Sequence, residues 1–131
     1  MAEKLLHSKL TEKIIQSFYA VNVSFRDSIS TDTYGKALSI EFEFVGLKFI
    51  KNYSVELKYR DKPVGQLSVD FLVEDKVMVK IVEVPKIDSQ IQEQVMFLLR
   101  KSRYEVCIVL NLAGDREFKR FVFTNNFKKE K

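Results

Sequence analysis

Apolar residues recur every third or fourth position in the first part of the chain and every second position further along. The first stripe consists of Leu6, Leu10, Ile14, Phe18 and Val21. Because this spacing places all of these side chains on one face of a helix, it predicts an amphipathic helix over residues 3–22.

A second helical stripe lies over residues 32–46. Ser30 or Thr31 is suited to cap this helix, since short hydroxyl side chains bond the free amides of a first helical turn. Gly46 stands where helices commonly end in the left-handed conformation. The segment Ile-Glu-Phe-Glu-Phe at 40–44 also fits a strand, so the sequence leaves the end of this helix open.

Apolar and polar residues alternate over residues 48–60, which predicts a strand with one polar face. Residues 60–63 form a turn sequence, and a second alternating strand follows over 64–73. A tight turn at 74–76 leads into residues 77–84, which are almost continuously apolar. That pattern is typical of a central strand covered on both faces.

Ser89 is suited to cap a third helix over residues 90–102, and residues 104–112 read as another buried strand. A strand, a crossover helix and a further strand favour a parallel pair. A last strand is predicted over 117–124, followed by a solvated tail at 125–131.

The predicted order is α-α-β-β-β-α-β-β, which indicates an α/β fold with helices packed on a mixed sheet. The 131 residues fit a single domain, 1–131, long enough to bury a core. A composition that is 46% hydrophobic with few Gly and Pro argues against disorder.

Charge and residue counts narrow the function classes. The 22 Lys and Arg exceed the 18 Asp and Glu, and the net charge of +4 permits a polyanionic partner without requiring one. A single cysteine, Cys107, and a single histidine, His7, exclude a disulfide framework and a zinc cluster. No apolar run is long enough to span a bilayer, and no signal peptide is evident, so we expect a cytoplasmic protein without a membrane partner.

Asp70 and Lys80 carry the most informative chemistry. Asp70 ends the alternating part of its strand, and Lys80 lies ten residues later on an otherwise apolar face of the next strand. This arrangement resembles the metal site of a large nuclease superfamily, in which an aspartate precedes a Glu-x-Lys strand. Here the second half reads Lys80-Ile81-Val82 instead.

Longer stretches resemble the GxxExxY proteins, a family placed in the PD-(D/E)xK nuclease-like superfamily. The matching pieces are residues 5–15, Tyr34, 37–38, Glu41, 46–47, 59–79, Gln94, Leu99, 109–112 and 117–123. The resemblance runs through nearly the whole chain. It implies a three-layer, restriction-endonuclease-like core with a mixed central sheet.

The signature residues of that family are largely replaced. Its Gly-x-x-Glu-x-x-Tyr falls on Ser28, Thr31 and Tyr34, and its following acidic residues fall on Gly35 and Lys36. Its sheet aspartate is Asp70, its Glu-x-Lys falls on Lys80 and Val82, and its helical Gln-x-x-x-Tyr falls on Gln94 and Leu98. Only Tyr34, Asp70 and Gln94 match.

The chemistry implied by the resemblance needs carboxylate oxygens around Mg²⁺ and a lysine that activates water. An ammonium at Lys80 repels Mg²⁺ and is expected to pair with Asp70 instead. Glu83 lies on the opposite face of the strand, so it does not replace the missing acid. For Gln94, the simplest expectation is a hydrogen bond to nearby backbone.

These residues predict a degenerate site at Asp70, Lys80 and Gln94, with Asp70 as the one metal-ligand candidate and Mg²⁺ relevant only if activity is retained. The function predicted is a catalytically inactive, nuclease-like module that binds DNA or RNA. Its candidate phosphate contacts are Lys80, Lys86, Arg100, Lys101 and Arg103, with Lys119 and Arg120 as weaker ones, although such charges also suit a solvated face.

Two alternatives remain open. The first is a structural or protein-interaction subunit, a homodimer or larger assembly, that uses the strand at 48–60 or the aromatic residues at 118–123. The second is a metal-dependent nuclease whose site residues have moved elsewhere.

Overall fold

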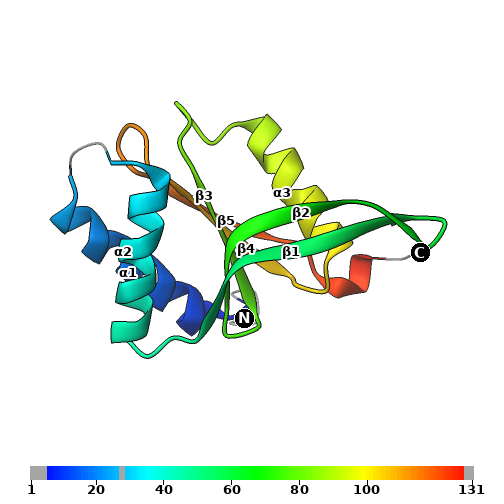
Figure 1. Ribbon diagram of the computed structural model, residues 1–131, viewed down its shortest axis with the longest axis horizontal. Helices are drawn as coiled ribbons and strands as arrows, with labels where there is room; N and C mark the ends of the chain where they lie inside the picture. The colour runs from blue at the N-terminus through cyan, green and yellow to red at the C-terminus, as the bar shows by residue number, and fades with distance from the viewer. Residues whose placement is uncertain (1–5, 27–28, 129–131) are drawn as a thin grey trace.

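The computed structural model describes residues 6–26 and 29–128. Its elements are α1 (Ser8–Ser24), α2 (Thr31–Phe44), β1 (Phe49–Tyr59), β2 (Lys62–Val73), β3 (Val77–Val82), α3 (Ser89–Lys101), β4 (Val106–Asn111) and β5 (Phe118–Val122). A short 3₁₀ helix, Asn125–Phe127, follows β5. The order of helices and strands is the predicted one (Figure 1).

The strands form one five-stranded mixed sheet in the order β1-β2-β3-β4-β5. β3 and β4 are parallel, and the other neighbours are antiparallel. The parallel pair joined through α3 confirms the crossover predicted for this segment. The chain therefore has the α/β fold with a mixed sheet that the pattern indicated.

Helices cover the sheet on both faces (Figure 1), which gives three layers. On one face α1 and α2 pack with strand residues that include Phe71, Val79 and Ile108. On the other face α3 packs on residues that include Met78 and Cys107. β3 and β4 supply both cores because successive side chains of a strand point to opposite faces.

The end of α2 settles the question that the sequence left open. Ser30 is the cap, and its side-chain oxygen accepts a hydrogen bond from the Thr33 amide at 3.0 Å. Residues 40–44 are helical rather than extended. Gly46 adopts a φ of 81°, and the Leu47 amide behind it bonds the Phe42 carbonyl at 2.8 Å. Tertiary packing of Phe42 on the sheet overrides the strand propensity of the segment.

Other predicted boundaries need correction. α1 begins at Ser8, after His7 in the left-handed conformation, and residues 3–5 of the predicted helix lie outside the described residues. α3 is capped by Asp88 rather than Ser89, since Asp88 Oδ1 accepts a hydrogen bond from the Ile91 amide at 3.1 Å. An aspartate serves this position as well as a serine does.

The largest difference lies in β1, for which the pattern predicted one continuous apolar face. Phe49 packs with the α1–α2 side of the sheet, whereas Tyr53 and Val55 pack with α3. The change of face occurs at Asn52, which has a φ of 56°, and β2 changes face at the neighbouring Asp70. Asparagine tolerates this conformation better than most residues, so the irregularity falls where the sequence permits it.

The first residues of the predicted solvated tail, 125–128, contact the rest of the fold. Asn125, Asn126 and Phe127 are exposed, but they form the 3₁₀ helix. Lys128 Nζ donates hydrogen bonds to the carbonyls of Ser102 and Tyr104, at 3.0 and 2.6 Å. The remaining residues of the predicted tail, 129–131, lie outside the described part of the chain.

Candidate functional site

Asp70 lies where β2 separates from β3. The paired region of these strands comprises Phe71 with Val79, Leu72 with Met78 and Val73 with Val77. Pairing therefore stops at Phe71, and Asp70, its neighbour in the sequence, is unpaired with β3. Asp70 Oδ2 accepts a hydrogen bond from the Ile81 backbone amide at 2.6 Å. The carboxylate thus takes the place that a β2 carbonyl would occupy if the ladder continued.

Lys80 lies in a groove between β2, β3 and α3. Its partner in register on β4 is Val109, which belongs to the α3 side of the sheet, so Lys80 points to that side as well. The groove has a volume of about 480 Å³ and is lined by Gln66, Leu67, Ser68, Lys80, Gln94, Val95 and Leu98. The structure therefore brings Lys80 and Gln94 together.

Gln94 is exposed, and its side chain makes no hydrogen bond to another residue in the described part of the chain. The expected bond from Gln94 to nearby backbone is thus not formed. Gln66 and Ser68, the other polar groups of the groove, were not recognised from the sequence because no motif marks them. Simple alternation from Leu72 would place Gln66 and Ser68 on the face toward α3. The change of face at Asp70 gives that face to Leu67 and Val69 instead, and Ser68 Oγ lies 3.4 Å from Ser54 Oγ.

Asp70 lines a different, smaller cavity, of about 200 Å³, at the start of α2. The residues that line it are Thr31, Asp32, Gly35, Lys51, Asn52, Asp70 and Phe71. Asp70 and Lys80 do not form the expected ion pair, since among the described residues no contact of 4.0 Å or less joins their charged atoms. The Ile81 amide satisfies Asp70 instead.

The residues around Asp70 do not suit a Mg²⁺ site of the superfamily type. Among the side chains that the structure describes, no three of His, Cys, Asp and Glu come close enough to hold a metal ion. Asp32 shares the cavity with Asp70, but Lys51 lines it too, and Asp32 Oδ2 lies 3.5 Å from Lys36 Nζ. Ammonium groups compete with a cation for these carboxylates.

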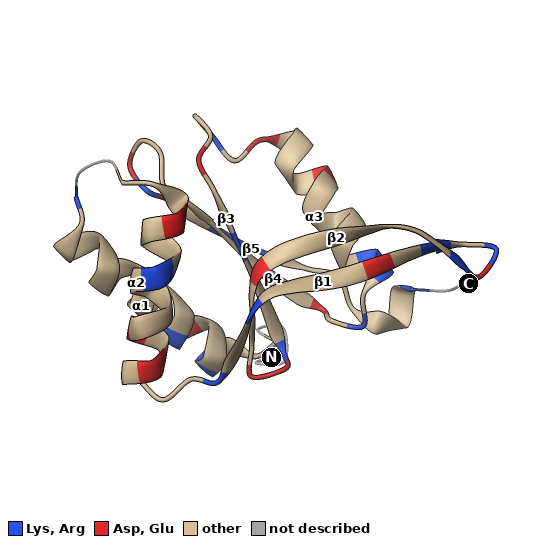
Figure 2. Cartoon of the chain, in the orientation of Figure 1, with Lys and Arg blue, Asp and Glu red and all other residues tan. Residues whose placement is uncertain are grey.

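The candidate phosphate contacts do not form one patch. Lys86 precedes α3, whereas Arg100 and Lys101 lie in its last turn, so about 20 Å of helix separates them. Arg103 bonds Asp75 at 3.1 Å and lies over the Tyr104 ring. Figure 2 shows acidic residues interspersed among the basic ones over much of the chain.

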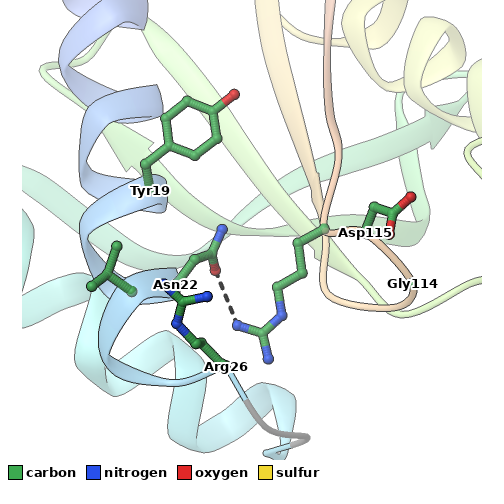
Figure 3. Close-up of a pocket in the computed structure, with 7 residues that line it drawn as sticks. Tyr19, Asn22, Arg26, Gly114 and Asp115 are labelled. Atoms are coloured by element: carbon green, nitrogen blue, oxygen red, sulfur yellow. Dashed lines mark hydrogen bonds between the residues drawn. The ribbon is translucent and has the colours of Figure 1, made fainter.

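Tyr34, which the sequence aligned with the tyrosine of the Gly-x-x-Glu-x-x-Tyr motif, has a structural role. Its buried hydroxyl lies 2.6 Å from Asn22 Oδ1, to which it donates a hydrogen bond. Arg116 donates to the same oxygen at 3.1 Å, the bond drawn as a dashed line from Asn22 in Figure 3. It also donates to the Phe25 carbonyl. This network joins α1, α2 and the β4–β5 loop beside a cavity of about 390 Å³. Burial raises the pKa of Tyr34, so the hydroxyl stays protonated.

Comparison with known families agrees with the α/β fold described above. The PD-(D/E)XK nuclease superfamily matches residues 8–121, which include all five strands except the last residue of β5. No curated protein and no solved structure shows a significant match. None of the described helices is long and apolar enough to cross a membrane. The match covers most of the sequence, and the chain belongs to the PD-(D/E)XK nuclease superfamily.

Proposed function

We propose that this chain is a GxxExxY-like, catalytically silent member of the superfamily that binds nucleic acid without cutting it. One observation carries the proposal: Lys80 stands in the groove at the position where the superfamily's second acidic ligand is expected. A lysine there favours a phosphate and disfavours a divalent cation.

A second polar group of the groove supports phosphate binding. Gln94 of α3 adds an amide group to the groove that Lys80 lines. Such side chains commonly contact phosphate oxygens and position a protein on the duplex without reading its sequence. We therefore expect binding that is weakly sequence-dependent and strongly salt-dependent.

A pair of assays on the purified chain tests the proposal. Labelled DNA and RNA should bind at low salt, weaken steeply as salt rises, and stay intact with Mg²⁺ or Mn²⁺. Lys80→Gln should weaken binding several-fold, whereas Lys36→Gln, an exposed lysine of α2, should leave it unchanged. Absence of binding at low salt, with a stable dimer by light scattering, would instead support the structural-subunit alternative.

A double substitution tests the assignment of the metal positions. Wild type should show no saturable Mg²⁺ binding by calorimetry. Lys80→Glu combined with Val82→Lys restores the Glu-x-Lys pattern, so it should create a measurable Mg²⁺ site that Asp70→Ala then removes. Tight Mg²⁺ binding by the unmodified chain would contradict the proposal.

A relocated metal site is the second candidate, because Asp32 and Asp70 line the same cavity. Two carboxylates with the Asn52 amide are enough for Mg²⁺ in some sites, which usually keep several waters. Under this alternative, Asp32→Asn should abolish cleavage as completely as Asp70→Asn does. Our proposal predicts no cleavage to abolish.

A further inference from the structure

The hairpin of β1 and β2 extends well beyond the rest of the sheet. β2 has 12 residues, but only Phe71, Leu72 and Val73 pair with β3. The segment from Lys62 to Val69 pairs with β1 alone, and Figure 1 shows it as a two-stranded ribbon that projects past β3. Isolated ribbons of this kind are marginally stable, so its base needs support from packing.

The base of the ribbon receives that support from α3. Tyr53 and Val55 of β1, with Leu67 and Val69 of β2, pack in the same cluster as Val95, Leu98 and Leu99 of α3. The ribbon is therefore held along its inner half. The outer half, from Glu56 to Gln66, is almost entirely exposed.

The tip of the ribbon, residues 58–62, gathers cations around an exposed aromatic ring. Lys58, Arg60 and Lys62 flank Tyr59, which is 65% exposed and lies 5.6 Å from the Arg60 guanidinium. Asp61 is the one acidic residue of this segment. Arg60 and Asp61 both have positive φ, of 51° and 66°, so the turn is tight and the tip is narrow.

We propose that the tip of this ribbon enters the major groove of double-stranded DNA. A two-stranded ribbon fits the major groove of B-form DNA, about 12 Å wide, whereas the deep, narrow groove of duplex RNA excludes it. The inference rests on the proposed function and adds a partner and a second contact surface to it.

The spacing of the tip and the Lys80 groove suits one duplex. Six residues of extended strand separate Lys62 from Ser68 in the groove, or about 20 Å. That span corresponds to about six base steps along B-form DNA at 3.4 Å each. An alternative explanation for the charges at the tip is that charged strand edges prevent aggregation. That role does not account for the exposed apolar side chains of Tyr59 and Val64, the latter 66% exposed.

A matched pair of triple variants tests the inference. The ribbon variant carries Lys58→Gln, Arg60→Gln and Lys62→Gln. The control carries Lys9→Gln, Lys13→Gln and Arg26→Gln, which remove the same charges from exposed positions on or just after α1. Circular dichroism and thermal unfolding should show both variants folded, because none of the six side chains is buried.

Fluorescence anisotropy with labelled duplex DNA over a salt series gives the readout. The ribbon variant should lose at least ten-fold in affinity, and its slope of log K against log salt should fall by about 2 to 3, as expected for three lost phosphate contacts. The control should keep the slope of wild type. Duplex RNA should compete poorly for the wild-type protein.

Equal losses in the two variants, with binding still sensitive to Lys80→Gln, would overturn the ribbon inference while leaving the proposed function standing. Equal competition by duplex RNA would likewise overturn it. Failure of wild type to bind any nucleic acid at low salt would overturn both.

Discussion

The two sides of β3 are built differently. On its β4 side, all six residues from Val77 to Val82 pair in parallel register with Val106–Asn111. On its β2 side, pairing stops after three residues and the strands separate at Asp70. The closed side contains the most deeply buried part of the protein, and the open side contains the groove and the ribbon.

A polar side chain ends the ladder on each side. Asn111, 1% exposed, accepts hydrogen bonds from the amides of Val84 and Ala113 and donates one to the Val84 carbonyl. Asp70 is half-buried and accepts one bond, from Ile81. The closed side is thus specified by a buried amide with three hydrogen bonds, while the open side keeps a carboxyl group near solvent.

The largest effect should come from breaking the closed side. Asn111→Ala leaves two backbone donors and one acceptor without their partners, and we expect it to lower the free energy of unfolding by about 3 kcal/mol. Urea unfolding followed by circular dichroism measures it. Asn126→Ala, at an exposed position, should change stability by less than about 0.5 kcal/mol. Similar values for the two variants would contradict the role assigned to Asn111.

A smaller effect is expected on the open side. Asp70→Ala removes the acceptor of the Ile81 amide and should cost about 1.5 kcal/mol, since water reaches part of the site. Asp70→Asn keeps a side-chain oxygen and should cost less. If Asp70→Ala proved neutral in the same unfolding assay, the hydrogen bond to Ile81 would not be what fixes this carboxylate.

The smallest effect concerns Asp75, in the turn that joins β2 to β3. The Tyr104 hydroxyl donates to Asp75 Oδ1 at 2.5 Å, and this bond, with the nearby Arg103 guanidinium, holds the pKa of Asp75 below its ordinary value of 3.8. A lowered pKa in the folded state adds stability that is present above pH 3.8 and is lost as the pH falls through the folded-state value.

Tyr104→Phe should therefore raise the pKa of Asp75, as measured by NMR titration of its carboxyl group. The same variant should flatten the pH dependence of stability below about pH 4. Arg100→Gln, which removes an α3 charge that does not contribute to the Asp75 pKa, serves as the control. An unchanged Asp75 pKa in Tyr104→Phe would show that the hydrogen bond is not the main cause of the shift.

Much of the fold follows from periodicity. The stripe through Ile14 and Phe18 predicted α1, and the continuous apolar run at 77–84 predicted β3, which ends at Val82. Burial on one face or on both constrains residue type directly. The change of face at Asn52 leaves no such pattern. One residue with positive φ moves the apolar side chains beyond it to the other side of the sheet, and the alternation itself is unaltered.

The site was less predictable, because the course of the backbone at Asp70 also leaves the residue pattern unaltered. The sequence placed Lys80 on an otherwise apolar face of its strand, and the partner expected for it was Asp70. Asp70 bonds a backbone amide instead, because β2 leaves β3 at that residue. Hydrogen bonds to the main chain depend on where strands separate, and residue type does not report that position.

The reactivity of Cys107 offers a way to measure how tightly α3 packs on the sheet. The thiol lies fully buried beneath α3, and burial raises its pKa to about 12. Disulfide exchange and alkylation require an accessible thiolate, so neither proceeds in the closed molecule. The rate of modification by a thiol reagent then reports how often α3 lifts from the sheet. A bound duplex that bridges the Lys80 groove and the ribbon would slow that opening. The rate at which Cys107 is modified would then fall, and no added label is needed to measure it.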